Sequence, residues 1–123
     1  MRLARMYDGV QGGPYFADSH RRIEDPAERE LIAGFLRGGR AVSRTSGRDT
    51  DRVVPERGEV VPLSFRTDGH WVWSEALGYY LEIYGMAPEP EFVRHIAGCG
   101  YQAAEPDATA LRAAAVAVRP HRS

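Results

Sequence analysis

The sequence predicts an α+β fold, in which a small antiparallel sheet is built on a hairpin over residues 60–73 and about three to four helices pack against one face of it. Three observations support this prediction. Apolar residues make up 43% of 123 residues and charged residues 27%, which is enough for one core and indicates a single domain over residues 1–123. An Asp-Gly pair at 68–69 lies between two alternating apolar runs, and several segments show helical spacing of apolar residues.

The hairpin has the clearest pattern. Val61, Leu63 and Phe65 alternate before the Asp-Gly pair, and Trp71 and Trp73 alternate after it. We expect Asp68 and Gly69 to form a two-residue turn with positive φ at both positions, so that the two runs pair as antiparallel strands. The segment 2–7 alternates weakly and is predicted as an edge or first strand, and 40–44 as a short strand.

Capping and stop residues predict the helices. Asp25 followed by Pro26 indicates a helix over 26–37, which the Gly38-Gly39 pair ends with a left-handed residue. Ser74 is expected to cap a second helix that ends at Gly85. Two more helices are predicted over about 89–98 and 107–118, the last with Asp107 as its cap. Residues 45–58 are predicted as a mobile loop and 119–123 as a frayed basic tail.

Charge is divided unevenly along the chain, although the net charge is only −1. Residues 37–66 contain seven arginines against four acids, and residues 67–107 contain seven acids against Arg94 alone. The acidic half also holds most of the tryptophan and tyrosine, and exposed aromatics among carboxylates form recognition surfaces. The leading hypothesis is therefore a non-enzymatic protein-binding domain that uses this surface against a basic partner. The predicted partner-binding residues are Asp68, His70, Trp71, Trp73, Glu75, Tyr79 and Glu82.

The basic half supports an alternative function. Arginines that recur every three to five residues can neutralise phosphates, so the second hypothesis is a nucleic-acid or nucleotide-binding module. Its predicted phosphate-binding residues are Arg44, Arg48, Arg52, Arg57 and Arg66. Acids are interleaved with these arginines and no aromatic residue accompanies them, which favours a solvated loop over a nucleic-acid site.

No catalytic, cofactor or metal motif is recognised, and a third hypothesis is an enzyme whose site is assembled from dispersed residues. His95 and Cys99 are four residues apart and would share a helical face. Two ligands do not complete a zinc site, and a catalytic thiol needs its base oriented by a third group. Cys99 is therefore interpreted as a small buried thiol, and we predict no cofactor and no metal. The single cysteine and the absence of an apolar signal segment or membrane span favour the cytoplasm.

The block Ser64-Phe65-Arg66-Thr67-Asp68-Gly69-His70-Trp71-Val72-Trp73, together with Tyr79-Tyr80-Leu81 and Tyr84-Gly85, resembles a family of small proteins from high-GC bacterial genomes. That family carries a SFRTDGxWVW hairpin block and has no assigned activity, so the resemblance implies none. In size and format the chain also resembles the immunity proteins that neutralise bacterial toxins. That likeness implies a basic toxin as the protein partner.

Overall fold

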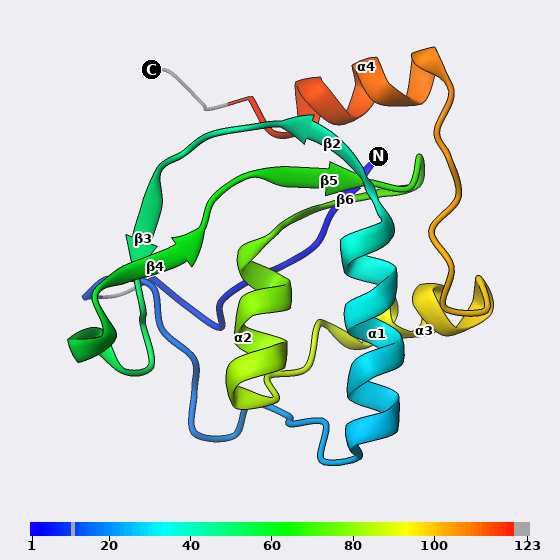
Figure 1. Ribbon diagram of the computed structural model, residues 1–123. Helices are drawn as coiled ribbons and strands as arrows, with labels where there is room; N and C mark the ends of the chain where they lie inside the picture. The colour runs from blue at the N-terminus through cyan, green and yellow to red at the C-terminus, as the bar shows by residue number, and fades with distance from the viewer. Residues whose placement is uncertain (11, 120–123) are drawn as a thin grey trace.

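The computed structural model describes residues 1–10 and 12–119, with helices on both sides of a sheet. The helices are α1 (Pro26–Gly38), α2 (Ala76–Tyr84), α3 (Pro90–Gly98) and α4 (Ala108–Ala117), and a single 3-10 turn spans Pro55–Arg57. The strands are β1 (Arg2–Leu3), β2 (Arg40–Ser43), β3 (Arg48–Thr50), β4 (Glu59–Pro62), β5 (Phe65–Thr67) and β6 (Trp71–Ser74). Figure 1 shows α4 above the sheet and the other helices below it, so the expectation that all helices pack on one face is wrong. The predicted α+β class is confirmed.

The main sheet has the strand order β1-β6-β5-β2 and is mixed. β5 is antiparallel to both β6 and β2, as predicted, whereas β1 runs parallel to β6 with Arg2 opposite Trp71. The expectation of a purely antiparallel sheet is therefore wrong at this edge. The parallel pairing is possible because the long connection from β1 to β6 carries α1 and the other strands, and parallel neighbours need such a crossover.

The hairpin forms, but its turn differs from the predicted one. Thr67 pairs with Val72 and the amide of Asp68 bonds to the carbonyl of Trp71, so Gly69 and His70 occupy the two central positions. Only Gly69 has a positive φ, of 95°. Glycine adopts this positive φ without steric cost, which suits the first central position of the turn. Asp68 stands just before the turn and holds it, because its Oδ1 accepts hydrogen bonds from the amides of His70 and Trp71. Only Oδ2 is left for another role.

The segment before the hairpin divides into two strands. β4 pairs with β3 in a separate two-stranded sheet, and only β5 belongs to the hairpin. β3 falls inside the predicted loop 45–58, which also contains the 3-10 turn and the fully buried Asp51. The polar composition of residues 45–58 does not predict a strand. β3 forms because β4 supplies hydrogen-bond partners for its backbone.

Helix α1 begins as predicted and ends differently. The carboxylate of Asp25 accepts a hydrogen bond from the amide of Ala27 at 3.0 Å, and Pro26 occupies the first turn. At the other end Gly39 has φ −67°, so the predicted left-handed stop is wrong. Glycine is required there for space, because a Cβ at Gly39 would lie 2.4 Å from Cζ2 of Trp73.

The other helices follow their local signals closely. Gly85 ends α2 in the left-handed conformation with φ 75°, as predicted. The predicted cap of α2 is off by one residue: Glu75 is the cap and makes no capping bond with its side chain, although Ser74 Oγ accepts from the amide of Ala76 at 3.1 Å. Asp107 caps α4 by accepting from the amide of Ala110 at 2.8 Å. The predicted basic tail lies almost entirely outside the described residues.

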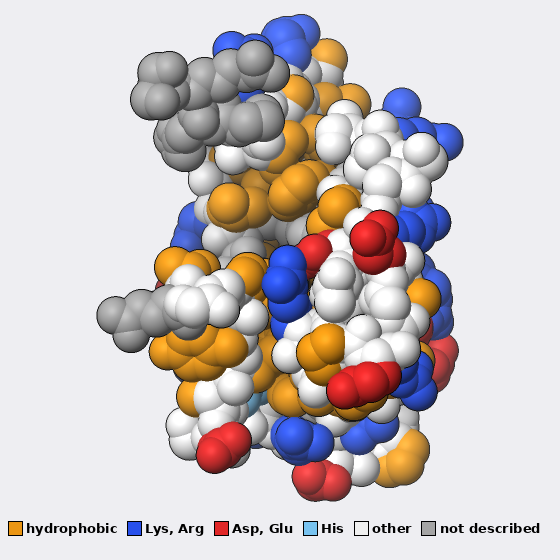
Figure 2. Space-filling view, turned by 90° about the vertical axis from the view of Figure 1, so that its left-hand side faces the viewer, with side chains coloured by type: hydrophobic (Ala, Val, Ile, Leu, Met, Phe, Trp, Pro, Cys, Tyr) orange, Lys and Arg blue, Asp and Glu red, His pale blue; other side chains and the backbone are white. Residues whose placement is uncertain are grey.

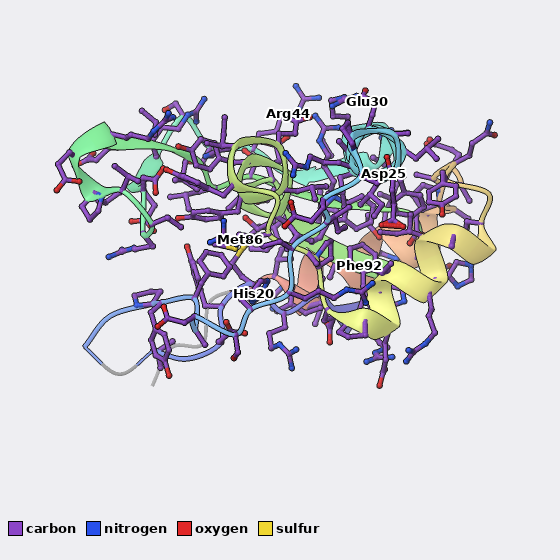
Figure 3. The ribbon with its side chains drawn as sticks, turned by 90° about the horizontal axis from the view of Figure 1, so that it is seen from below. His20, Asp25, Glu30, Arg44, Met86 and Phe92 are labelled. Carbon is purple, nitrogen blue, oxygen red and sulfur yellow. The ribbon has the colours of Figure 1, made fainter. Side chains whose placement is uncertain are left out.

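The main core lies between the sheet and α1, α2 and α3. The rings of Trp71 and Trp73 point from β6 toward these helices, and each packs on Phe92 of α3. Figure 3 shows Phe92 in the space between α3 and α1, where Phe35 meets it at 6.1 Å between ring centroids. Both tryptophans are therefore fixed inside the molecule by rings on two helices.

The second face of the sheet is only partly covered. α4 packs on β2 and β6, and its Ala114 is fully buried. Figure 2 shows apolar side chains gathered beneath α4 on one side of the molecule. An apolar hollow of about 370 Å³ has Leu3, Leu63 and Phe65 among its lining residues. Within the described residues, no helix has the length and apolar character that a membrane span requires.

Candidate functional site

Three side chains that are separate in the sequence meet at the end of α3. A carboxylate oxygen of Asp68, the imidazole Nε2 of His95 and the thiol Sγ of Cys99 all lie within 4.8 Å of one another. Nε2 of His95 is 2.6 Å from Oδ2 of Asp68 and 3.6 Å from Sγ of Cys99. These three residues are called the Asp68–His95–Cys99 centre below.

The backbone of the hairpin turn holds Asp68 in place. Its Oδ1 accepts hydrogen bonds from the amides of His70 at 3.0 Å and Trp71 at 2.9 Å. These bonds occupy one carboxylate oxygen and leave Oδ2 directed at His95. Burial of Asp68 opposes ionisation, but the hydrogen bonds from His95 and the two amides outweigh it and hold the pKa of Asp68 below its usual value. Asp68 is therefore a buried, ionised carboxylate at neutral pH.

Aromatic rings fix the plane of the His95 side chain. The imidazole stacks on Phe92 with an interplanar angle of 15° and meets Phe35 edge-on at 88°. About a fifth of the side chain remains exposed, whereas the side chain of Asp68 has no exposure. The centre therefore combines a fully buried carboxylate with an imidazole ring that is partly exposed.

Cys99 follows the last residue of α3 and shares a face with His95. Its amide bonds to the carbonyl of His95 at 3.0 Å, which continues the helical geometry past Gly98. The thiol is half-buried. Burial raises the pKa of the Cys99 thiol, and the negative charge of Asp68 raises it further. At neutral pH the thiol is protonated when nothing else is bound.

The geometry does not favour a catalytic thiol. In a Cys-His-Asp triad the base uses one ring nitrogen for the thiol and the other for the carboxylate. Here Nε2 of His95 faces both Asp68 and Cys99. Because an ionised carboxylate can only accept, Nε2 carries the proton that it donates to Asp68 and has no lone pair for the thiol. The carboxylate oxygen, the imidazole nitrogen and the thiol sulfur instead all lie close to one point between them.

Sequence reasoning finds two members of this centre and misses the third. The spacing of His95 and Cys99 places them on one face, but the sequence offers no third group beside them. Asp68 lies 27 residues before His95, and its sequence pattern indicates a turn and a docking surface instead. No local signal relates the turn to α3. The contact depends on Trp71 packing on Phe92, which brings the hairpin against that helix.

The predicted partner-binding residues do not form one exposed surface. Asp68, Trp71 and Trp73 are at most 5% exposed. The expectation that the two indole rings face water is therefore wrong. Glu75 pairs with Arg66, and Glu82 shares Arg37 with Glu30. Tyr79 is half-buried and donates to Asp51, and only His70 and Glu82 are exposed. Protein docking at these seven residues stays a prediction.

The predicted phosphate-binding arginines divide into two groups. Arg44, Arg48 and Arg66 line one polar hollow. Arg52 instead pairs with Asp49 at 2.8 Å, and the guanidinium of Arg57 lies 5.9 Å from the ring of Tyr84. The chain therefore brings three of the five arginines together.

Comparisons of the chain with protein-family models, with curated proteins and with solved structures found no match. The geometry of the chain is therefore the basis on which its function is inferred.

Proposed function

We propose that this protein binds one divalent transition-metal ion of the zinc class at the Asp68–His95–Cys99 centre. The observation that carries the proposal is the convergence of an oxygen, a nitrogen and a sulfur donor within 4.8 Å of one another. Among the described residues, this is the one such group of three histidine, cysteine or acidic side chains.

The donor set supports zinc over other common cations. Zinc accepts thiolate, imidazole and carboxylate ligands, whereas calcium and magnesium prefer oxygen donors throughout. Thiolate with imidazole favours zinc among the metals that proteins commonly hold. The carboxylate and a thiolate would together offset the two positive charges of the ion. The chemistry of the three side chains thus points to one class of metal.

One of the two close separations in the centre fits a tetrahedral ion. Zinc–sulfur and zinc–nitrogen bonds of about 2.3 and 2.0 Å at a tetrahedral angle place the two ligand atoms about 3.5 Å apart. The observed separation of Sγ of Cys99 and Nε2 of His95 is 3.6 Å. Nitrogen and oxygen ligands of zinc lie about 3.3 Å apart, so the 2.6 Å contact between His95 and Asp68 must open by about 0.7 Å. Binding also requires that Nε2 of His95 and Sγ of Cys99 each lose a proton to solvent, so that both can coordinate the ion. The imidazole is partly exposed, and it would have to move away from Asp68 as the ion enters.

The hairpin turn supports one of the three ligands by hydrogen bonds from outside the centre. The carboxylate of Asp68 is hydrogen-bonded at its other oxygen by two backbone amides. Ligands held in this way keep their orientation before the ion arrives. The fourth position of a tetrahedral ion is not filled by these three residues. His70 is exposed and its ring lies 5.8 Å from that of His95, so His70 or water can take that position.

Metal titration with a matched variant tests the proposal. The purified protein is stripped with a chelator and titrated with zinc against a chromophoric competitor, and bound metal is counted by elemental analysis. We expect one equivalent in the natural chain. Cys99→Ser should weaken binding by more than the roughly 10- to 100-fold that loss of an outer-shell partner costs. Glu91→Gln is the control, because Glu91 is an exposed acid on the same helix.

Two further readouts separate this site from adventitious binding. With cobalt in place of zinc, the natural chain should show a sulfur-to-cobalt charge-transfer band, and Cys99→Ser should not. Because Cys99 is the one cysteine of the chain, its alkylation rate reports on this site alone, and zinc should slow it. Equal zinc affinity in the natural chain and Cys99→Ser, or unchanged alkylation with zinc bound, would contradict the proposal.

A further inference from the structure

We propose that the polar hollow between β2, β3 and β5 binds the phosphate group, or a similar oxyanion, of one small molecule. The hollow has a volume of about 300 Å³. Its polar lining residues are Arg44, Thr45, Arg48, Ser64, Arg66 and Glu75. Figure 3 shows Arg44 on the side of the molecule away from α3, so this hollow is separate from the Asp68–His95–Cys99 centre.

The charge inside the hollow is positive after internal pairing. Arg66 donates to Glu75 at 2.8 Å and to the carbonyl of Gly39 at 2.7 Å, so Arg66 and Glu75 neutralise each other. Among the residues that the structure describes, Arg48 donates only to the backbone carbonyls of Ser46 and Gly47. Two arginine charges, those of Arg44 and Arg48, therefore remain without a carboxylate among the described residues.

The guanidinium of Arg44 is free to meet a ligand. Within the part of the chain that the structure describes, it makes no hydrogen bond and no ion pair, although it lines the hollow. A guanidinium presents five donors in a planar fork that matches two oxygens of a phosphate. An oxyanion beside Arg44 would therefore satisfy donors that now face only solvent.

The hydroxyl of Ser64 holds the loop in place, and the hydroxyl of Thr45 adds one donor to the hollow. Ser64 Oγ accepts a hydrogen bond from the amide of Thr45 at 2.9 Å and donates one to the carbonyl of Thr45 at 3.3 Å. These two bonds join the turn after β2 to the residue before β5. Thr45 Oγ1 accepts from the amide of Gly47 at 3.1 Å. The hydroxyl hydrogen of Thr45 thus stays available to donate to an anion. The turn already has a defined conformation before any ligand binds, which lowers the entropic cost of ligand binding.

The same observations favour a small molecule over a nucleic acid. A polynucleotide track needs a series of cations along its backbone and aromatic rings for its bases. Arg52 is held by Asp49 and Arg57 lies against Tyr84, so neither extends the row. No aromatic side chain lines the hollow. Its volume is at the lower end of the range for small-ligand sites.

Titration of the full chain with inorganic phosphate tests the inference. Amide resonances are followed by NMR at fixed ionic strength, with chloride as the reference anion. We expect phosphate to shift the amides of residues 44–48 and Ser64. The double variant Arg44→Gln with Arg48→Gln should weaken phosphate binding by about tenfold or more, because it removes charge-assisted hydrogen bonds to the anion. Arg94→Gln, an exposed arginine on α3, is the matched control.

The outcomes distinguish this inference from the alternatives. No phosphate-dependent shift at residues 44–48, or equal shifts in the double variant, overturns it. Affinity that appears only with oligonucleotides and rises with their length also overturns it, in favour of a nucleic-acid surface. A folded double variant is verified by an unchanged denaturation midpoint, because both arginines lie at the surface.

Discussion

The hydroxyl of Tyr84 donates a hydrogen bond of 2.6 Å to Oδ2 of Asp51, although the two residues are 33 positions apart. Tyr79 donates to the same oxygen at 2.5 Å, and the amides of Val53 and Val54 donate to Oδ1. Asp51 is fully buried. One carboxylate thus joins the segment after β3 to two turns of α2.

Asp51→Asn is expected to destabilise the fold by about 3 kcal/mol, because it removes the charge and turns one acceptor into a donor that faces donors. Its neighbour Asp49 offers a matched control. Asp49 is half-buried and pairs with Arg52, and Asp49→Asn should cost less, about 1 kcal/mol, because Asp49 is nearer to solvent than Asp51. Urea denaturation of the three proteins measures the difference. Equal midpoints for the two variants would show that the hydrogen bonds of Asp51 contribute no more than the Asp49–Arg52 pair.

The same carboxylate makes stability depend on pH. Burial acts to raise the pKa of Asp51, but the hydrogen bonds from Tyr79, Tyr84 and two amides lower it below its ordinary value. A lowered folded-state pKa contributes stability that is fully present above about pH 4 and is lost as the pH falls through the folded value. The stability difference between the natural chain and Asp51→Asn should therefore shrink between about pH 5 and pH 2. A difference that is constant over this range would contradict the prediction.

The helices could be predicted because their signals are local. Asp25 with Pro26, the glycine at 85 and the cap Asp107 each act on backbone groups within a few residues. The hairpin was predictable for the same reason, apart from the exact turn positions. The parallel pairing of β1 with β6 was not predictable, because nothing in the sequence around Arg2 or Trp71 indicates that these two residues pair.

The candidate site shows the same limit. The spacing of His95 and Cys99 is visible in the sequence, and their geometry follows from the helix. Asp68 joins them only through the packing of Trp71 on Phe92. The acidic, aromatic-rich composition of residues 67–107 favours an exposed surface when it is considered alone. Its largest rings instead fill the core, since a large aromatic ring contributes most when it is buried.

Two glycines, one within α1 and one at its end, should respond oppositely to substitution. A Cβ at Gly39 would lie 2.4 Å from Cζ2 and 2.7 Å from Cη2 of Trp73, so Gly39→Ala must displace a buried ring and should cost about 1–3 kcal/mol. Gly34 lies within the helix with nothing within 4 Å of its added Cβ, and Gly34→Ala should stabilise by about 1 kcal/mol. Thermal denaturation compares them. Shifts of the same sign would show that Trp73 adapts freely.

Adjacent alanines of α4 test whether that helix covers the second face of the sheet. Ala114 is fully buried and Ala113 is exposed. Ala114→Glu would bury a carboxylate beside β2 and β6 without a partner, so α4 should detach and the chain should lose about 2–4 kcal/mol of stability. Ala113→Glu places the same group in solvent and should change stability by less than about 0.5 kcal/mol. Limited proteolysis measures detachment directly, since cleavage after the arginine at 112 should accelerate in Ala114→Glu alone. Equal cleavage rates in the two variants would mean that α4 does not need its buried Ala114 face to pack on the sheet.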